Sequence, residues 1–442
     1  MEIKNIIIQP VCNIRGGIKP GHYKNTAAQT SLVMPAPKRV EIVMHQHIGA
    51  PCIPCVKPGD TVCVGTKLGD SESNFSAPIH SSVSGTVAKM GNIMLSSGNR
   101  CQTVIIDSDD QMTLDPNIKP VKVETLDDLV KATRQSGLVG LGGAGFPTHI
   151  KLNINPQKPV DTLIINGAEC EPYITSDDRE CIENPNDILE GALLLKRVMG
   201  FKNVIICIES NKPEAITTLS HLISDKKYSS IKIMTLKTNY PQGAEKVLIY
   251  TATGRKLPLG KLPLDVGCVV MNVTSIAFLN RYINTGVPLV SKRITIDGPA
   301  IAKPQTVIVP IGTSIKEVID FCGGLKCEAK KILMGGPMMG VALLDINAPI
   351  LKQNNAILAF DENESTLPPT TACIHCGRCA AACPMNLMPA AIETALKMKN
   401  VDKIKKLNVA YCIECGSCAF SCPAKRPLTQ TMRLAKAEVK KS

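Results

Sequence analysis

Two cysteine-rich stretches near the C-terminus determine how the rest of the sequence is interpreted. The first runs from Cys373 to Pro384 and reads CIHCGRCAAACP, and the second runs from Cys412 to Pro423 and reads CIECGSCAFSCP. Both have the spacing C-x2-C-x2-C-x3-C-P. Three thiolates at this spacing can bind three corners of one iron–sulfur cubane, and the fourth Cys, followed by Pro, begins a helix that carries its thiolate away. The repeat therefore predicts two [4Fe–4S] clusters.

The same spacing occurs in two-cluster bacterial ferredoxins, in which the last Cys of each run binds the other cluster. We expect one ligand set to be Cys373, Cys376, Cys379 and Cys422, and the other to be Cys412, Cys415, Cys418 and Cys383. Zinc knuckles or disulfides are the alternative, but two matching copies that each end in Pro argue against them. We expect His375 to be a neighbour of a cluster and not a ligand, since every thiolate position is filled. The domain at residues 360–442 is thus predicted to transfer single electrons.

The composition sets the class of protein. A chain of 442 residues predicts about three domains, each large enough to bury its own core. There are 19 Cys but no N-terminal signal sequence, which indicates a reducing compartment. The longest apolar runs have the length of strands, so membrane contact is expected only through partners. The net charge of +12 is not accompanied by any nucleic-acid-binding module, so we expect an acidic redox partner or an anionic membrane surface and no nucleic acid.

The first domain is expected at residues 1–115. Residues 1–30 are rich in turns, and short β-runs separated by Pro and Gly follow from Val33 to Asp107. Residues 56–62 and 77–87 resemble the two halves of biotinyl- and lipoyl-type barrel-sandwich domains, but the hairpin between them lacks the modified lysine. We therefore expect a structural β-domain. Cys52 and Cys55 form a C-x-x-C with no second half for zinc, and we interpret them as incidental thiols.

The second domain is expected at residues 116–265. An amphipathic helix at 126–135 precedes a glycine-rich loop, Gly140 to Phe146, whose backbone N–H groups could approach a phosphate closely. Strands at 161–165, 203–209 and 230–236 then alternate with helices at 185–199 and 212–224. This pattern predicts a parallel, doubly wound sheet with its ligand at the carboxyl ends of the strands. There the loops 140–146, 166–172 and 239–245 should converge.

Four motifs in this region resemble, in order, the FMN- and NADH-binding motifs of the flavoprotein subunit of respiratory complex I. They are GLGGAGFPTHIK at 140–151, NGAECEP at 166–172, YPQGAE at 240–245 and NVT at 272–274. The whole chain more closely resembles the family of C subunits of the Rnf electron-transport complex. That family begins with a Gly-Gly element, here Gly16 and Gly17, before its barrel-sandwich segment, and it ends with two ferredoxin motifs.

The resemblance implies two [4Fe–4S] clusters, FMN and NADH as cofactors, and no catalytic side chain. It places Gly140, Gly142 and Asn166 along the FMN, with Asn272 and Thr274 nearby. It places Phe146 on a ring of the nucleotide, Lys151 at its phosphates, and Glu171, Tyr240 and Glu245 at other parts of it. The remaining cofactor-binding residues of the same motifs are Gly143, Gly145, Glu169 and Gly243. The chain departs from complex I at Ala168 and Ala244, where that family has acidic residues.

Each of these residues also has a plainer interpretation. Phe146 can belong to the core, Asn166 can cap a helix, and Lys151, Glu171 and Glu245 can be solvated charges. Cys170 is interpreted as a small buried residue. An acidic side chain that binds the ribose 2′-OH would favour NADH over NADPH, and Glu171 or Glu245 has the right chemistry for this role.

Residues 266–355 resemble the small ubiquitin-like (β-grasp) domain of complex I and Rnf subunits. We expect it to act as a spacer between flavin and clusters, followed by a polar linker at 361–369. A basic helix is expected at 430–441. The predicted fold is therefore a multidomain α/β protein: a barrel-sandwich domain, a Rossmann-like domain, a β-grasp domain and a helical ferredoxin domain.

By resemblance to the Rnf family, the chain would be a peripheral subunit on the cytoplasmic face of the cell membrane. It would exchange electrons with NADH or NAD+, and its partners would be other subunits of the complex, including a ferredoxin-like iron–sulfur subunit. Those subunits would move Na+ or H+, and both ions and both directions of electron flow fit the sequence. Two alternatives are a soluble cobalamin reductase, and a ferredoxin-like electron carrier that binds no nucleotide.

Overall fold

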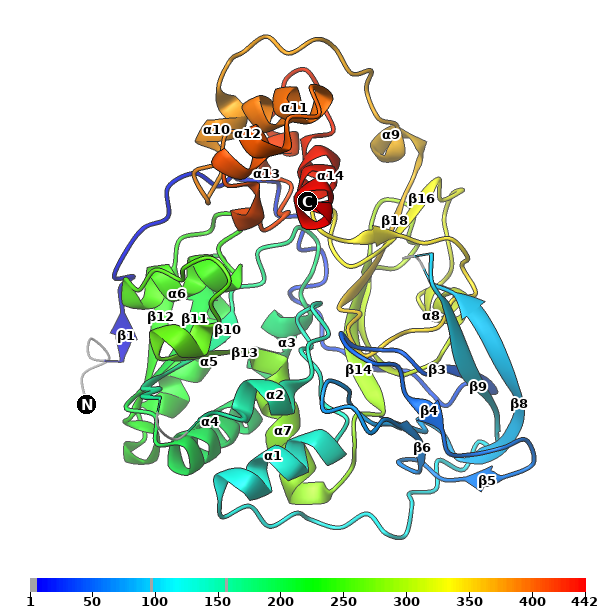
Figure 1. Cartoon of the computed structure of the whole chain (residues 1–442). Helices are drawn as coiled ribbons and strands as arrows, with labels where there is room; N and C mark the ends of the chain where they lie inside the picture. The colour runs from blue at the N-terminus through cyan, green and yellow to red at the C-terminus, as the bar shows by residue number, and fades with distance from the viewer. Residues whose placement is uncertain (1–5, 96–97, 156–157) are drawn as a thin grey trace.

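The computed structural model describes residues 6–95, 98–155 and 158–442. It contains the four expected parts (Figure 1): a parallel sheet with helices, two β-rich parts beside it, and a small helical domain that lies above the others in this view. The predicted fold class is confirmed. None of the helices within the described ranges is both long and apolar enough to span a membrane.

The N-terminal β-domain consists of two small sheets. One has the order β3 (Arg39–Val43), β9 (Arg100–Ser108), β8 (Gly85–Met94) and β5 (Thr61–Val62). The other has the order β4 (Ile53–Pro54), β6 (Lys67–Asp70) and β7 (Ile79–His80). Alternate β-branched residues point inward, and a fully buried core of Val40, Ile42, Val104 and Ile106 joins β3 to β9.

The parallel sheet has the strand order β1 (Ile7–Ile8), β12 (Ile231–Leu236), β11 (Asn203–Glu209), β10 (Thr162–Gly167) and β13 (Cys268–Asn272). One face packs on α1 (Leu126–Gln135), α4 (Pro185–Met199), α5 (Pro213–Ile223) and α7 (Val273–Thr285). The other face packs on α6 (Glu245–Thr253). Helices thus cover both faces, and the central strands are near-continuous apolar runs for that reason.

β13 and α7 lie beyond the expected domain boundary at residue 265, yet they belong to the same domain as this sheet. β13 pairs with β10 along its whole length, and α7 packs on one face of the sheet. Two short helices follow the loops of this domain: α2 (Thr148–Leu152) follows the glycine-rich loop, and α3 (Ser176–Glu183) follows β10. α3 begins beyond the carboxyl end of β10, where we expected the ligand site.

The β-grasp part is a sheet with the order β17 (Val341–Ala342), β16 (Lys331–Met334), β18 (Ala356–Phe360), β14 (Ser291–Asp297), β15 (Gln305–Pro310) and β2 (Leu32–Val33). Helix α8 (Ile315–Phe321) packs on it, and its N-terminus carries a capping box of Ser314 and Glu317. Two edge strands, β1 and β2, come from or adjoin the N-terminal extension, for which we predicted turn-rich chain and no strand. This extension, residues 9–31 with its two flanking strands, therefore crosses from one sheet to the other; we call residues 9–31 the N-terminal arm.

The ferredoxin domain holds six helices: α9 (Glu362–Ser365) in the linker, then α10 (Arg378–Ala381), α11 (Pro389–Lys397), α12 (Val401–Lys406), α13 (Ser417–Phe420) and α14 (Leu428–Lys441). Its two halves repeat in conformation as well as in sequence. His375 and Gly377 have positive φ in the first cysteine loop, and Glu414 and Gly416 have positive φ at the same positions of the second. Arg426 and Glu393 join the halves, with the Arg426 Nε donating to Glu393 over 2.7 Å.

Candidate functional site: the sheet edge and two cysteine groups

The structure gathers the eight motif cysteines into two groups. Cys373, Cys376, Cys379 and Cys422 line one cavity of about 370 Å³. Cys383, Cys412, Cys415 and Cys418 line a second, much tighter one of about 20 Å³. These are the same sets that the motif predicts, in which the last Cys of each run joins the other group.

Both groups have the chemistry that an iron–sulfur cluster requires, which is four sulfur donors and nearby amide N–H groups. The Leu387 amide N lies 3.4 Å from the Cys383 Sγ, and the Glu414 amide N lies 3.4 Å from the Cys412 Sγ. Burial and the neighbouring thiols raise the pKa of Cys418 to about 12. Iron would supply the positive charge that a buried set of thiolates needs.

The two groups differ in their surroundings. In the first, Cys376 is exposed, and the cavity also has the exposed side chains of Ile374 and Met388 at its rim. In the second, Cys415 is buried, and its carbonyl oxygen accepts a hydrogen bond of 2.7 Å from the hydroxyl of Tyr240. The second group therefore faces the parallel sheet, and the first faces solvent.

The N-terminal arm lies between the second cysteine group and the sheet. Ile18 pairs with Tyr240 through two backbone hydrogen bonds of 2.8 Å, and the Gly17 amide donates to the Ala382 carbonyl over 2.9 Å. Gly16 and Gly17 have φ of +74° and +81°. A Cβ on Gly16 would lie 2.8 Å from the Cys383 carbonyl oxygen. The Gly-Gly element is thus needed for close contact next to a predicted cluster ligand.

The glycine-rich loop is an open turn at the edge of the sheet. It closes on itself through the Gly140 amide, which donates to the Phe146 carbonyl over 2.8 Å. Gly142 and Gly143 are exposed. A Cβ on Gly140, Gly143 or Gly145 would meet no atom closer than 3.5 Å. Packing leaves room for a side chain at these three glycines, whereas φ of +106° at Gly143 and +60° at Gly145 favours glycine there. The exposed backbone of Gly142 and Gly143 fits a cofactor that must approach closely.

Side chains from the other motifs surround this loop. Lys151 donates to Glu245 over 3.1 Å and to the Val270 carbonyl over 3.3 Å, and its Nζ lies 5.7 Å from the centre of the Phe146 ring. Asn166 donates to the Gly243 carbonyl over 2.9 Å. The loops after β10, β12 and β13 therefore converge near the glycine-rich loop.

Asn272 lies next to Gly142, and Asn272 and Thr274 together bind a buried carboxylate. Their side chains donate to Asp177 over 2.7 and 2.6 Å, and Asn272 also caps α7 by accepting from the Ser275 amide. Burial raises the pKa of Asp177, while Lys292 lowers it. Lys292 donates to the Leu141 carbonyl over 2.9 Å, and its own burial lowers its pKa to about 8. No motif pointed to Asp177 or Lys292, because they lie more than 100 residues apart, on α3 and β14, and influence each other only in the folded chain.

Three predicted nucleotide contacts have structural partners in the protein. Glu169 accepts from the amides of Asp177 and Asp178 at the start of α3, and burial raises its pKa. Glu171 accepts from the amides of Met338 and Met339 over 3.0 and 2.9 Å, and burial raises its pKa to about 7.

Tyr240, the third, is only 2 % exposed and binds the cysteine loop as described above. Both acidic residues proposed for the ribose are partly exposed, and the Glu245 side chain is 40 % exposed.

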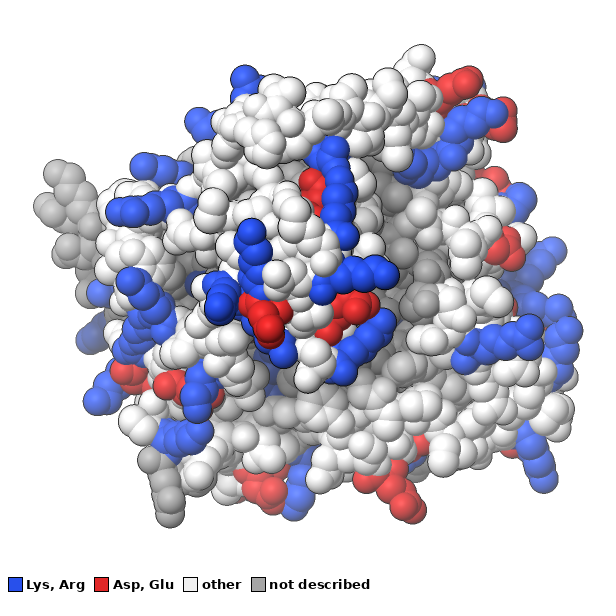
Figure 2. Space-filling view, turned by 45° about the horizontal axis from the view of Figure 1, so that its top comes forward, with Lys and Arg blue, Asp and Glu red and all other residues white. Residues whose placement is uncertain are grey.

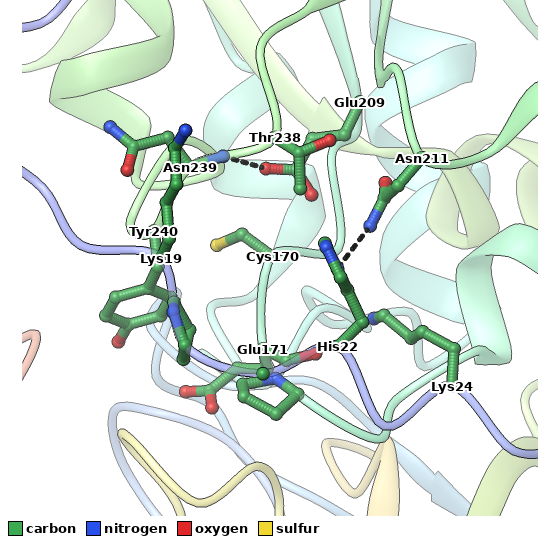
Figure 3. Close-up of a pocket in the computed structure, with 13 residues that line it drawn as sticks. Lys19, His22, Lys24, Cys170, Glu171, Glu209, Asn211, Thr238, Asn239 and Tyr240 are labelled. Atoms are coloured by element: carbon green, nitrogen blue, oxygen red, sulfur yellow. Dashed lines mark hydrogen bonds between the residues drawn. The ribbon is translucent and has the colours of Figure 1, made fainter.

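A cavity of about 180 Å³ lies where the arm crosses the carboxyl edge of the sheet (Figure 3). Lys19 and His22 of the arm lie on one side, and Glu209, Asn211 and Thr238 lie on the other, with the Cys170 side chain between them. Burial raises the pKa of Cys170 to about 12, so its thiol is protonated at neutral pH.

Lys24 of the arm donates to the carbonyls of Glu169 and Glu171 over 3.0 and 2.9 Å. Sequence reasoning missed Lys24, since it lies in no motif.

The extra cysteines of the β-domain point in different directions. Cys52 belongs to the core, and its Sγ lies 3.3 Å from the Ala77 carbonyl oxygen. Cys55 is exposed and lies 3.2 Å from the Lys67 carbonyl oxygen. This placement gives no shared site for the two thiols.

Comparison with known proteins divides the chain into the same four parts. Residues 12–111 match the RnfC barrel sandwich hybrid domain, and residues 133–281 match the Nuo51 FMN-binding domain. Residues 293–342 match the SLBB domain, and residues 369–423 match a 4Fe-4S dicluster domain. The second match ends inside α7, as the pairing of β13 with β10 requires.

Several relatives match over nearly the full length. The chain is 42 % identical to the C subunit of the Na+-translocating ferredoxin:NAD+ oxidoreductase complex of Acetobacterium woodii, over 96 % of both chains. It is 40 % identical to the C subunit of the proton-translocating ferredoxin:NAD+ oxidoreductase complex of Clostridium ljungdahlii, over 96 % of this chain and 94 % of the relative. It is 37 % identical to the C subunit of the ion-translocating oxidoreductase complex of Rhodobacter capsulatus, over 97 % of this chain and 83 % of the relative.

Among solved structures, the H2-reduced NAD+-reducing [NiFe]-hydrogenase is similar in fold, with a TM-score of 0.50 at 18 % identity, over 73 % of this chain and 65 % of that chain. The near-full-length relatives and the RnfC domain match together show that the chain belongs to the family of C subunits of Rnf-type ion-translocating ferredoxin:NAD+ oxidoreductase complexes.

Proposed function

We propose that this chain carries electrons between NADH and the rest of an Rnf-type complex, by way of FMN and two [4Fe–4S] clusters. The observation that carries the proposal is the contact between Tyr240 and Cys415, which joins the edge of the parallel sheet to a cysteine group within one chain. The family relationship supports NAD+/NADH as the substrate, since the relatives from Acetobacterium and Clostridium are ferredoxin:NAD+ oxidoreductase subunits.

The bare backbone of Gly142 and Gly143, next to Asn272, is our proposed seat for FMN, and the match of residues 133–281 to an FMN-binding domain supports it. FMN accepts a two-electron hydride and releases single electrons, which is the conversion needed between NADH and iron–sulfur clusters. The protein's role in this scheme is to hold the ligands in place. Lys151 and Glu245, which pair at 3.1 Å, are the charged groups available to a nucleotide there.

The surroundings of the cysteine groups suggest an order of electron transfer. The Cys383/Cys412/Cys415/Cys418 group contacts the arm and Tyr240, so we assign it as the cluster proximal to the flavin. The Cys373/Cys376/Cys379/Cys422 group reaches the surface, so we assign it as the distal cluster, where electrons pass to or from a partner.

We place the chain as a peripheral subunit at the cytoplasmic face of the cell membrane, with Na+ or H+ moved by other subunits. Its partner at the distal cluster would be an acidic iron–sulfur subunit. Lys and Arg side chains are spread over much of the face that includes the top of the molecule (Figure 2), and Asp and Glu lie in small groups among them. Such a basic surface attracts acidic partners and anionic lipid.

The test is anaerobic reconstitution of the full chain with iron, sulfide and FMN, followed by stopped-flow absorbance after mixing with NADH. Loss of the flavin band, and then of the broad cluster absorbance, would support the proposed path. Clusters that form but do not respond to NADH at any FMN concentration would refute it, and the chain would then be an electron carrier supplied by another protein. The cobalamin reductase alternative is not favoured, because residues 12–111 match the RnfC N-terminal domain.

A further inference from the structure

The barrel-sandwich domain is fixed to the sheet domain through its central hairpin, residues 70–76. Arg134 of α1 donates to Asp70 over 2.8 Å and to the Ser71 carbonyl over 2.8 Å. On the other side of the hairpin, His149 of α2 lies 3.0 Å from the Asn74 carbonyl oxygen. The hairpin is therefore held by the helices on both sides of the glycine-rich loop.

This attachment brings Phe75 to the glycine-rich loop. The Phe75 and Phe146 rings lie edge to face, with centroids 5.3 Å apart and planes at 89°. The loop between β3 and β4 of the same domain also contacts the glycine-rich loop, since the Ile48 amide donates to the Gly145 carbonyl over 2.9 Å. Phe75 is nevertheless 40 % exposed. A large aromatic side chain held rigidly at a predicted nucleotide site, but with an open face, is suited to stacking on a ligand ring.

The charge next to this pair fits the same ligand. Lys151 lies 5.7 Å from the Phe146 ring centre, on the side of the loop where Glu245 and Val270 are. Two aromatic rings beside a cation match a heteroaromatic ring joined to phosphate. The hairpin also lacks the lysine that carries a prosthetic group in related barrel-sandwich domains, so its tip is free for another use.

We infer that Phe75 is a nucleotide-binding residue, whose ring stacks on a heteroaromatic ring of NAD(H) while Phe146, at 89° to it, contacts the edge of that ring. The barrel-sandwich domain thereby supplies part of the substrate site of the neighbouring domain. This inference rests on the proposed NADH function and adds to it a residue that lies outside all four nucleotide motifs. The adenine and the nicotinamide are both flat heteroaromatic rings, and the experiment distinguishes them.

The test is the affinity of the reconstituted full chain for NAD+, measured by titration calorimetry without an electron donor, in wild type, Phe75→Ala, Phe75→Leu and Phe75→Tyr. Loss of one base–aromatic stack should weaken NAD+ binding about 5- to 150-fold in the Ala and Leu variants. Phe75→Tyr keeps the aromatic face and should bind within about twofold of wild type. Phe75→Leu keeps most of the bulk, so it reports on stacking even where Phe75→Ala disturbs the hairpin.

The matched control is Phe321→Ala, since Phe321 lies on α8 and is exposed to a similar extent, 37 %. It should bind NAD+ like wild type. Weaker binding of ADP-ribose to Phe75→Leu would place the adenine on Phe75, and weaker binding of nicotinamide mononucleotide would place the nicotinamide there. Unchanged affinity of the Ala and Leu variants for all three ligands, with tight binding by wild type, would overturn the role of Phe75 alone. No NAD+ binding by wild type would overturn the proposed function itself.

Discussion

At the scale of single residues, Tyr240 links the sheet domain to a predicted cluster. Its hydroxyl donates to the Cys415 carbonyl, which draws electron density from the peptide next to a thiolate ligand. Loss of this hydrogen bond in Tyr240→Phe should disfavour the reduced, more negative cluster and lower its potential. A net hydrogen bond of about 1 kcal/mol corresponds to about 40 mV for one electron.

The measurement for Tyr240→Phe is a redox titration of the reconstituted chain followed by electron paramagnetic resonance. We expect one of the two cluster signals to shift by tens of millivolts to lower potential and the other to stay. Tyr282→Phe, in the core of the sheet domain, is the control and should shift neither. Equal potentials in Tyr240→Phe and wild type would show that the contact has no influence on the cluster.

Lys352 is a buried lysine at the junction of three domains. Its Nζ donates to the Pro78 and Gly137 carbonyls, each over 2.7 Å, and burial lowers its pKa to about 7. Between about pH 7 and the unfolded-state pKa of about 10.4, the unfolded chain binds more protons at this position than the folded chain. The free energy of unfolding should therefore rise with pH through this window. Below pH 7 the buried Lys352 is charged in the folded chain, and its destabilising effect is fully present.

Lys352→Met should remove this rise. In wild type, this lysine should raise the free energy of unfolding of the metal-free chain by up to about 2 kcal/mol between pH 7 and pH 8.5. The variant should lack this increase, as urea unfolding at the two pH values would show. The exposed Lys303→Met should leave the difference between the two pH values as in wild type. The same pH dependence in Lys352→Met and wild type would mean that Lys352 keeps its ordinary pKa in the folded chain.

At the scale of elements, the N-terminal arm contacts both the sheet domain and the ferredoxin domain. In Gly17→Ala, a Cβ would lie 2.5 Å from the Asn239 Nδ2 and 2.8 Å from the Tyr240 carbonyl oxygen, at a φ that favours glycine. The arm must then move away from its position next to the backbone of Cys383. We expect flavin reduction by NADH to keep its rate and cluster reduction to slow by at least about tenfold, since about 1–3 kcal/mol of strain acts at this contact.

Gly260→Ala is the control for backbone strain, because Gly260 has a φ of +73° but no atom within 4 Å of its would-be Cβ. Stopped-flow traces at the flavin and cluster wavelengths separate the two steps. If both variants slow the cluster step equally, strain alone explains the effect. If neither slows it, the arm does not position the ferredoxin domain.

Elements with local patterns could be predicted from the sequence, and contacts between distant segments could not. Helix α4 begins at Pro185 and ends before Gly200, and both residues mark helix ends in the sequence, so its bounds were predicted as observed. The two cysteine groups follow from the spacing together with its resemblance to two-cluster ferredoxins. β1 and β2 are two residues long and exist only because an edge strand elsewhere accepts them.

The nucleotide motifs predicted where the loops meet, but not what each side chain binds. Glu171 binds amides of a turn more than 160 residues away, and no local pattern encodes that partner. Phe75 was missed for the same reason, because it reaches the glycine-rich loop from another domain.

At the scale of the whole molecule, four parts are arranged so that one cysteine group is enclosed and the other is open. Tyr240 and Gly16 contact the loops of Cys415 and Cys383, whereas Cys376 and the exposed Ile374 and Met388 lie at the rim of the other group. Electrons that enter at the sheet edge should meet the enclosed cluster first. Loss of the enclosed cluster and loss of the open cluster should therefore have different effects on electron transfer.

Cys376→Ser should impair the open cluster and leave the enclosed one reducible by NADH, so that one cluster signal still appears in NADH-treated samples frozen within seconds. Electron transfer to a soluble acidic ferredoxin should fall by at least about tenfold, because the cluster that passes electrons to the partner is lost.

Cys415→Ser should remove the enclosed cluster and with it the NADH-dependent reduction of the open one, although dithionite still reduces that cluster directly. Iron content and the dithionite-reduced spectrum of each variant establish which cluster is present. If Cys415→Ser still allows rapid reduction of the open cluster by NADH while Cys376→Ser blocks reduction of the enclosed one, the order of the clusters is the reverse of the one proposed.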